Sequence, residues 1–229
     1  MNGAKTIGAS AAAIILIGLA IAAWAGNPTP GPATAAATTG TGVERQLDPM
    51  LEARTKGAAD APIMIYEMSD FQCPYCRDFY AETMPALFEE YVETGKVRFT
   101  FLNLPIIQIH PNAAEAHEFA MCAAAQDQFW PMHDALFGTQ QEWERQRDPT
   151  PHFMSLVADA ELDGDAFNQC MQSGMARRIV AQDVQSAMRN RLDKTPTFII
   201  EGQAFMGGAP METWRPMLDS LYALKTAGS

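Results

Sequence analysis

The chain has few basic residues: 16 lysines and arginines stand against 27 aspartates and glutamates, which gives a formal net charge of −11 at pH 7. Nucleic acids and anionic lipid surfaces bind proteins through clustered positive charge. The composition therefore argues against nucleic acid as a partner. The sequence also shows no internal repeat, and 229 residues leave room for one packed domain and an appendage.

A zinc-binding pattern is also missing. The four cysteines form one C-x-x-C pair, Cys73 and Cys76, and two single residues, Cys122 and Cys170. A tetrahedral zinc site needs two more ligands at a suitable spacing, and there is no second C-x-x-C and no H-x3–5-H. The four histidines, which show no metal-ligand spacing, are His110, His117, His133 and His152. We therefore predict no metal and no cofactor, and we assign the histidines no catalytic role.

The N-terminal segment holds a long apolar run preceded by a single basic residue, Lys5. As a helix, residues 7–25 would be about 28 Å long, just enough to cross a hydrocarbon core. The run ends in a small-x-small pattern that a signal peptidase could cut before Gly26. Residues 1–26 are therefore predicted to be a membrane anchor or a signal peptide, and the length of the run favours the anchor. Either way we expect export, which suggests a periplasmic domain, tethered to the inner membrane if residues 7–25 are kept.

The next segment has the composition of a linker. Residues 27–42 are rich in Pro, Thr, Ala and Gly, with no charge and no large apolar side chain, so they cannot build a core. We predict a linker over residues 27–47 and a folded domain over residues 48–229. Export would place the cysteines of this domain where disulfides persist.

The folded part reads as strand, helix, strand, long helical stretch, hairpin and helix. The expected strands are Pro62–Met68, Lys96–Leu104, Pro196–Glu201 and Ala204–Met206, with a turn at Gly202. The expected helices are Asp48–Arg54, Cys73–Thr94 with a kink at Pro85, Asn112–Gln126, Phe129–Phe137, Pro151–Ala160, Asp163–Ser173, Ala176–Arg191 and Pro210–Leu224. Trp143, which has charged neighbours, is expected to face solvent. This order predicts an α/β, thioredoxin-like fold with a helical insertion at about residues 107–192.

The Cys73-Pro74-Tyr75-Cys76 motif directly follows the first expected strand. Two cysteines three residues apart at a helix start lie on one face of its first turn, within reach of a disulfide. The free N–H groups and partial positive charge of the helix N-terminus lower the pKa of the first thiol. Pro74 suits the first turn, where its missing N–H costs nothing. We therefore predict redox chemistry, with Cys73 as an exposed attacking thiolate and Cys76 as a more buried resolving thiol.

Two further positions are candidates for the same site. Glu67 lies in the middle of the first expected strand, where burial would raise its pKa and let it relay the proton of the resolving thiol. The alternative is an edge position that faces water. Thr195–Pro196 precedes the third expected strand, and a cis peptide there would leave the Thr195 backbone free to pair with an extended substrate. The alternative is an ordinary proline at a strand start.

Cys122 and Cys170 lie on separate expected helices of the insertion. In an oxidising compartment they could form a structural disulfide that closes a loop of about 48 residues. They could also remain two buried thiols that behave as small hydrophobic residues, or form a second redox pair. We favour the structural disulfide.

Together these motifs resemble the DsbA-like branch of the thioredoxin superfamily, which includes many exported bacterial oxidoreductases. The resemblance extends over residues 61–224. Its carriers are Glu67–Cys76, Gln128–Phe137 and Thr195–Phe198, followed by Gly202 and Gly207. Two positions depart from the pattern: Lys194 stands where a small residue precedes Thr-Pro, and the motif has Pro-Tyr where the best-known oxidase has Pro-His.

The resemblance implies a thioredoxin fold with a helical insertion, a Cys73–Cys76 redox disulfide, a cis Pro196 and Glu67 as the buried acid. It also implies that Cys122 and Cys170 form the additional pair seen in some members. Oxidases of this family pass a disulfide to newly exported proteins and are reoxidised by a quinone-linked membrane partner. The residues that we expect to contact the substrate are Pro74, Tyr75, Thr195 and Pro196.

We therefore expect an exported enzyme that introduces disulfides into reduced or unfolded exported proteins. A disulfide isomerase or reductase on the same fold is the nearest alternative, and a holdase with a merely structural disulfide is a more distant one. Residues 43–60 are too few for the separate dimerisation domain that such isomerases usually carry. This favours a monomeric oxidase.

Overall fold

The computed structural model describes residues 50–227. The predicted anchor or signal peptide (residues 1–26) and the predicted linker (27–47) lie outside the described residues. Among residues 50–227, no helix combines the length and the apolar character that crossing a bilayer requires.

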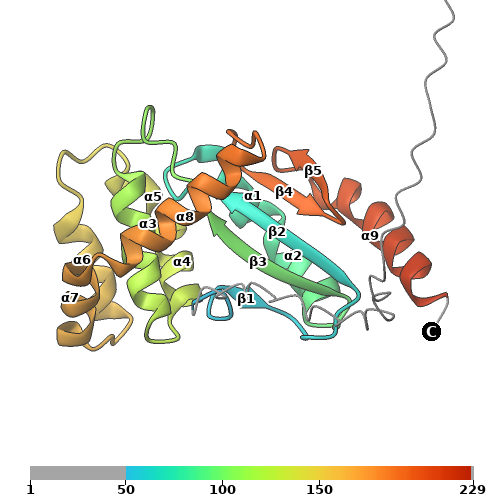
Figure 1. The fold of residues 1–229 in the computed structure, drawn as a ribbon, viewed down its shortest axis with the longest axis horizontal. Helices are drawn as coiled ribbons and strands as arrows, with labels where there is room; N and C mark the ends of the chain where they lie inside the picture. Colours follow the sequence, from blue (N-terminus) through green and yellow to red (C-terminus); the bar gives the residue numbers. More distant parts are fainter. Residues whose placement is uncertain (1–49, 228–229) are drawn as a thin grey trace, which may run out of the picture. The chain divides into compact units, whose positions relative to one another are not determined.

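A five-stranded mixed sheet, in the order β1-β3-β2-β4-β5, forms the centre of the domain (Figure 1). The central strand β2 (Ile63–Ser69) pairs in parallel with β3 (Val97–Asn103) and antiparallel with β4 (Thr197–Ile200). The edges are β1 (Thr55–Lys56), antiparallel to β3, and β5 (Gln203–Met206), antiparallel to β4. β2 lies between two neighbouring strands and carries mainly apolar residues. The residues that follow its carboxyl end, which lead into the cysteine motif, therefore start inside the protein.

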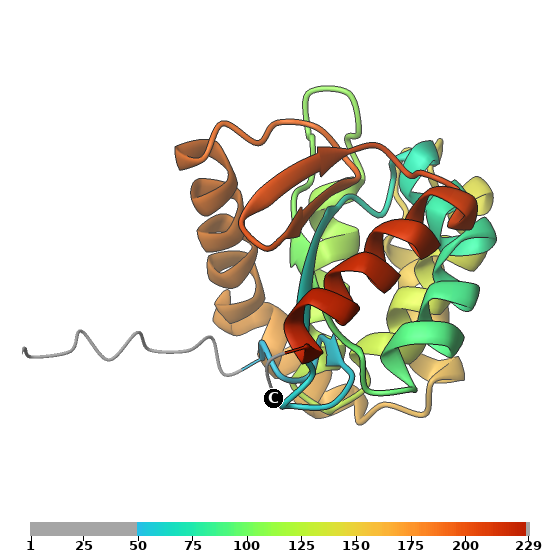
Figure 2. The same ribbon diagram turned by 90° about the vertical axis from the view of Figure 1, so that its right-hand side faces the viewer.

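Helices near the two ends of the domain sequence cover one face of the sheet (Figure 2). They are α1 (Pro74–Glu82), α2 (Met84–Leu87), the π-helix η1 (Phe88–Val92) and α9 (Met211–Thr226). Phe79 of α1 packs on Phe198 of β4, with ring centroids 4.6 Å apart, and Phe198 packs in turn on Trp214 of α9. This aromatic contact holds the helix that starts at the cysteine motif against the sheet.

The insertion between β3 and β4, which lies wholly within the described residues, consists of helices joined by loops and contains no strand. Its helices are α3 (Ala113–Ala124), α4 (Phe129–Gly138), α5 (Gln140–Trp143), α6 (Thr150–Asp159), α7 (Gly164–Ser173) and α8 (Met175–Arg189). Phe119 packs against both Phe153 and Phe167 in the core of this insertion. The predicted order of strands, helical insertion, hairpin and final helix is confirmed.

Two predictions about helices were wrong. The described part of the expected helix Asp48–Arg54 forms turns and leads into β1, because Arg54 is fully buried and Thr55 pairs with Thr100 of β3. The expected single helix Cys73–Thr94 is divided at Thr83, two residues before the expected kink at Pro85. Pro85 then lies in the first turn of α2, where a proline is tolerated.

The prediction that Trp143 faces solvent, which was based on its charged neighbours, was also wrong. Its side chain is fully buried, packs on Phe153 and donates an indole N–H hydrogen bond of 3.0 Å to the Leu136 carbonyl. A buried indole needs such an acceptor, so Trp143 anchors α5 to α4.

Candidate active site

The cysteine motif lies where β2 gives way to α1. Cys73 is the residue before the helix, and Pro74 occupies its first turn. The Cys73 backbone N–H donates to the Asp70 carbonyl (3.0 Å), and the Cys73 carbonyl accepts the first helical bond, from Arg77 (3.2 Å). Both cysteines are present as thiols. The local geometry is therefore that of a helix N-terminus with a sulfur at its start.

Cys73 is more buried than the sequence predicts. The residue is 4% exposed, whereas Cys76 is completely buried. Thr195 covers the Cys73 sulfur, since its carbonyl accepts a hydrogen bond of 3.6 Å from Cys73 Sγ. The expectation of an exposed Cys73 is corrected accordingly: its sulfur reaches solvent through a cavity, while Cys76 lies behind it.

The peptide bond between Thr195 and Pro196 is cis, as predicted. It precedes β4, and the Pro196 carbonyl accepts a hydrogen bond of 2.8 Å from Gly207 N after β5. The interpretation of Pro196 as an ordinary strand-start proline is therefore wrong. The arrangement brings a segment from the far end of the chain onto Cys73.

The two thiols differ strongly in acidity. The pKa of Cys73 is lowered to about 6, first by a hydrogen bond from the Cys76 thiol and then by the Thr195 side chain and by backbone N–H groups of α1, while burial opposes the change. Burial raises the pKa of Cys76 well above its ordinary value, and the neighbouring Cys73 adds to that rise. At neutral pH Cys73 is consequently a thiolate and Cys76 a thiol, the state that disulfide exchange requires.

Glu67 lies in the interior of the sheet, paired with Phe101 on one side and Phe198 on the other, and is fully buried. Burial raises its pKa to about 8, with a contribution from the Cys73 charge and an opposing one from the nearby Ser69 hydroxyl. Among residues 50–227 neither carboxyl oxygen meets a partner within hydrogen-bond geometry. The alternative of a water-facing edge position is excluded. Glu67 is thus a neutral acid at pH 7, close enough to Cys76 to affect its pKa.

The segment between β3 and α3 forms a wall of the site. Asp70, which is fully buried, accepts hydrogen bonds from Ile106 N (2.8 Å) and from His110 Nδ1 (2.7 Å). These bonds hold the segment beside the cysteine motif. No pattern in the sequence indicated a role for Asp70 or His110, because the two residues are 40 positions apart.

A mainly apolar cavity of about 510 Å³ opens beside the sulfur. The residues that line it are Cys73, Pro74, Tyr75, Ile106, Ile109, His110, Asp193, Lys194 and Thr195. Tyr75 is 70% exposed and Ile109 68% exposed, so large apolar side chains stand at its rim. Three of the four residues predicted to contact substrate, namely Pro74, Tyr75 and Thr195, therefore line one cavity. The fourth, Pro196, directly follows Thr195 in the chain.

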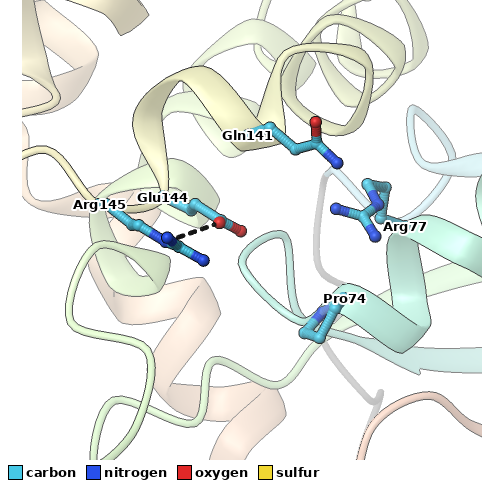
Figure 3. A pocket seen from close by; sticks show the side chains of 5 residues that line it. All are labelled: Pro74, Arg77, Gln141, Glu144 and Arg145. Atoms are coloured by element: carbon cyan, nitrogen blue, oxygen red, sulfur yellow. Dashed lines mark ion pairs between the residues drawn. The ribbon is translucent and has the colours of Figure 1, made fainter.

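A second hollow, of about 530 Å³, also has Pro74 on its wall (Figure 3). Figure 3 shows the carboxamide of Gln141 pointing toward the guanidinium of Arg77 on one side of the hollow. On the other side, Arg145 pairs with Glu144 at 3.3 Å. This hollow is polar, in contrast to the cavity beside Cys73. Pro74 thus lines both an apolar and a polar depression.

Cys122 and Cys170 form a disulfide between α3 and α7. Cys122 is fully buried and Cys170 is 7% exposed, within the core of the insertion. The predicted pairing is confirmed, and the alternative of two free thiols is wrong.

Comparison with known proteins identifies the family of this chain. A family model described as thioredoxin matches residues 51–220. The Na(+)/H(+) antiporter NhaA 3 of Salinispora tropica is 32% identical over 168 residues, which cover 73% of this chain and 24% of the antiporter. Disulfide bond formation protein D of Bacillus subtilis is 30% identical over 150 residues, 63% of this chain and 65% of that protein.

The chain spans 24% of the length of the Salinispora antiporters that it matches, so the antiporter activity is that of much larger proteins. Among solved structures, α-DsbA1 of Wolbachia pipientis is similar with a TM-score of 0.67 at 22% identity, covering 76% of this chain and 93% of that one. Likeness at this identity shows a common fold. Because the family model covers most of the chain and the fold agrees, the chain belongs to the thioredoxin family and carries a thioredoxin-like fold with a helical insertion.

Proposed function

We propose that the chain is a thiol–disulfide oxidoreductase of the DsbA type that acts chiefly as an oxidase. The observation that carries this proposal is the pair of thiols at the start of α1: Cys73, with its pKa lowered to about 6, opens onto a cavity, and Cys76 lies buried behind it. A thiolate stabilised in this way favours the reduced enzyme, which makes the disulfide form a strong oxidant. The name of the Bacillus subtilis relative, disulfide bond formation protein D, supports the same activity.

The reaction starts from the Cys73–Cys76 disulfide. A client thiolate attacks Cys73 Sγ, which forms a client–Cys73 bond and breaks the Cys73–Cys76 bond, so that Cys76 leaves as a thiolate and takes up a proton. A second client thiolate then attacks the client sulfur of the mixed disulfide. The client disulfide forms, Cys73 leaves as a thiolate, and two electrons have passed from the client to the enzyme.

Glu67 is proposed to carry the proton of Cys76. It is buried behind the motif, and its pKa of about 8 lies close to neutral pH, so it can both release and accept a proton there. Without such a proton donor, Cys76 would remain as an unpaired negative charge in a buried site, which is energetically costly.

Client binding is proposed to use the walls of the apolar cavity. An extended client segment would lie along the Thr195 backbone, with Pro196 behind it, and would contact Pro74 and Tyr75 at the rim. The exposed apolar side chains there suit unfolded proteins, which expose apolar residues.

We further propose the cellular setting from the sequence and the resemblance. Residues 1–26 would direct export, residues 7–25 would tether the protein to the inner membrane if uncleaved, and residues 27–47 would link this segment to a monomeric domain over residues 48–229. The redox partner would be a quinone-linked membrane oxidase. The buried Cys122–Cys170 disulfide is proposed to be structural.

The test is transfer of a disulfide from the oxidised protein to a reduced peptide that contains two cysteines. We expect the wild-type protein to oxidise the peptide and Cys73→Ser to lose the activity completely. Cys76→Ser should accumulate a mixed disulfide, visible as a larger species on non-reducing gels. The double variant Cys122→Ala/Cys170→Ala, assayed below its unfolding temperature, is the control and should retain transfer.

Other outcomes separate the alternatives. If Cys73→Ser prevented client aggregation as well as the wild type and the wild type oxidised nothing, the protein would be a holdase. Repair of a scrambled-disulfide protein faster than oxidation of a reduced one would make it an isomerase.

A further inference from the structure

We propose that His110 is an electrostatic partner of Cys73: an imidazolium that Asp70 holds on the wall of the apolar cavity and that stabilises the Cys73 thiolate. The inference rests on the proposed oxidoreductase function and adds to it a charge from outside the cysteine motif. It also revises the expectation, drawn from the sequence, that no histidine takes part in the chemistry.

Asp70 fixes the imidazole firmly. Its Oδ2 accepts hydrogen bonds from His110 Nδ1 (2.7 Å) and Ile106 N (2.8 Å), and its Oδ1 accepts one from Gln72 N (2.8 Å). Both oxygens thus act as acceptors, as those of a carboxylate do. Because Nδ1 is engaged with Asp70, Nε2 is the ring nitrogen left for other interactions.

The same residue also positions the sulfur. The Asp70 carbonyl accepts the Cys73 backbone N–H at 3.0 Å, so one residue holds the imidazole by its side chain and the nucleophile by its main chain. Cys73 and His110 line the same cavity. The side chain of His110 is 13% exposed and that of Asp70 is not exposed at all, so this pair is largely shielded from water.

The charged groups around the imidazole favour its protonated form. Its pKa is raised, first by the hydrogen bond with Asp70 and then by the negative charges of Asp70, Cys73 and Glu144, while burial opposes the rise. Asp193 and Lys194 also line the cavity, one with each sign of charge. Coupling between two sites is reciprocal, so a thiolate that stabilises the imidazolium is itself stabilised by it.

The stabilisation matters in the second step of exchange. When the client disulfide closes, Cys73 leaves as a thiolate, and a nearby positive charge in an apolar cavity makes it a better leaving group. His110 gives up no proton in this role. Its positive charge stabilises the negative charge on the Cys73 sulfur.

The first test replaces His110 with glutamine, whose amide can still donate a hydrogen bond to Asp70 but carries no charge. We expect the pKa of Cys73 to rise by about one unit, and the equilibrium with glutathione to shift by about tenfold toward the oxidised enzyme. His110→Lys, which restores a positive charge without the ring, should reverse at least half of both shifts. His152→Gln is the matched control: His152 bonds to Thr139 in the insertion, and its loss should change neither quantity.

An unchanged Cys73 pKa and glutathione equilibrium in a folded His110→Gln protein would overturn the proposal. A second measurement needs no variant, namely the titration of the His110 ring protons by NMR in the reduced and oxidised wild-type protein. We expect the pKa of His110 to fall by about one unit on oxidation, because Cys73 then carries no charge. Equal values in the two states would also overturn the proposal. This coupling does not depend on client oxidation, so it remains measurable if the proposed function fails.

Discussion

Replacing Glu67 with glutamine is expected to raise the free energy of unfolding by about 3 kcal/mol at pH 7. The carboxyl has an ordinary pKa of 4.5 and a folded-state pKa of about 8. Between these values the unfolded chain has released the proton and the folded protein retains it, so wild-type stability falls as the pH rises from 4.5 to about 8. Glutamine cannot ionise and removes this loss.

Urea denaturation at several pH values measures the effect. The two proteins should have nearly equal stability below pH 4.5, where the wild-type carboxyl is protonated in both states, and should diverge as the pH rises. Disulfide transfer by Glu67→Gln should nevertheless be slower, because the proposed proton carrier is gone. Glu82→Gln, a change at an exposed position of α1, should alter neither property. A variant that is less stable than the wild type at pH 7, or equally fast in transfer, would contradict this role for Glu67.

Removing the second disulfide is expected to cost about 4 kcal/mol of unfolding free energy in the chain-entropy model. Cys122 and Cys170 are 48 residues apart, and cross-linking them restricts the unfolded chain over that whole loop. The pair also lies in the insertion core beside Phe119 and Phe167, where replacement by alanine leaves little free volume. The measurement is denaturation of Cys122→Ala/Cys170→Ala.

The background for this comparison should carry Cys73→Ser and Cys76→Ser, so that reductant acts on one disulfide alone. Adding dithiothreitol should then lower the stability of the Cys122–Cys170 protein to that of the alanine variant and leave the alanine variant unchanged. A difference below about 1 kcal/mol would mean that the loop is already restricted in the unfolded state.

Much of the site could be predicted because its residues are close in sequence or belong to strong local patterns. Glu67, Cys73 and Cys76 fall within one strand–helix junction, where burial in the strand and the position at the helix start indicate which groups are buried and which thiol is the more acidic. The cis Thr195–Pro196 peptide was predicted only in combination with the cysteine motif. The helical insertion was predicted because residues 107–192 show helical patterns and no strand pattern.

The failures have a common physical origin in contacts between distant segments. Trp143 sits on a four-residue helix, too short to show a periodic apolar face, and its burial depends on Leu136 and Phe153. The two-residue strand β1 exists because it pairs with β3. His110 acquires its place from Asp70, and no pattern within either segment indicates that contact.

The most direct test of the account is the pH dependence of alkylation at Cys73 in the reduced wild-type protein. Iodoacetamide labelling followed by mass spectrometry distinguishes Cys73 from Cys76, whose high pKa and complete burial should leave it unreactive at first. We expect a midpoint near pH 6, with the thiolate formed above it and lost as the pH falls through it. A midpoint of about 8.5, as for a free cysteine, would show that the site does not activate the sulfur and would contradict the proposed oxidase.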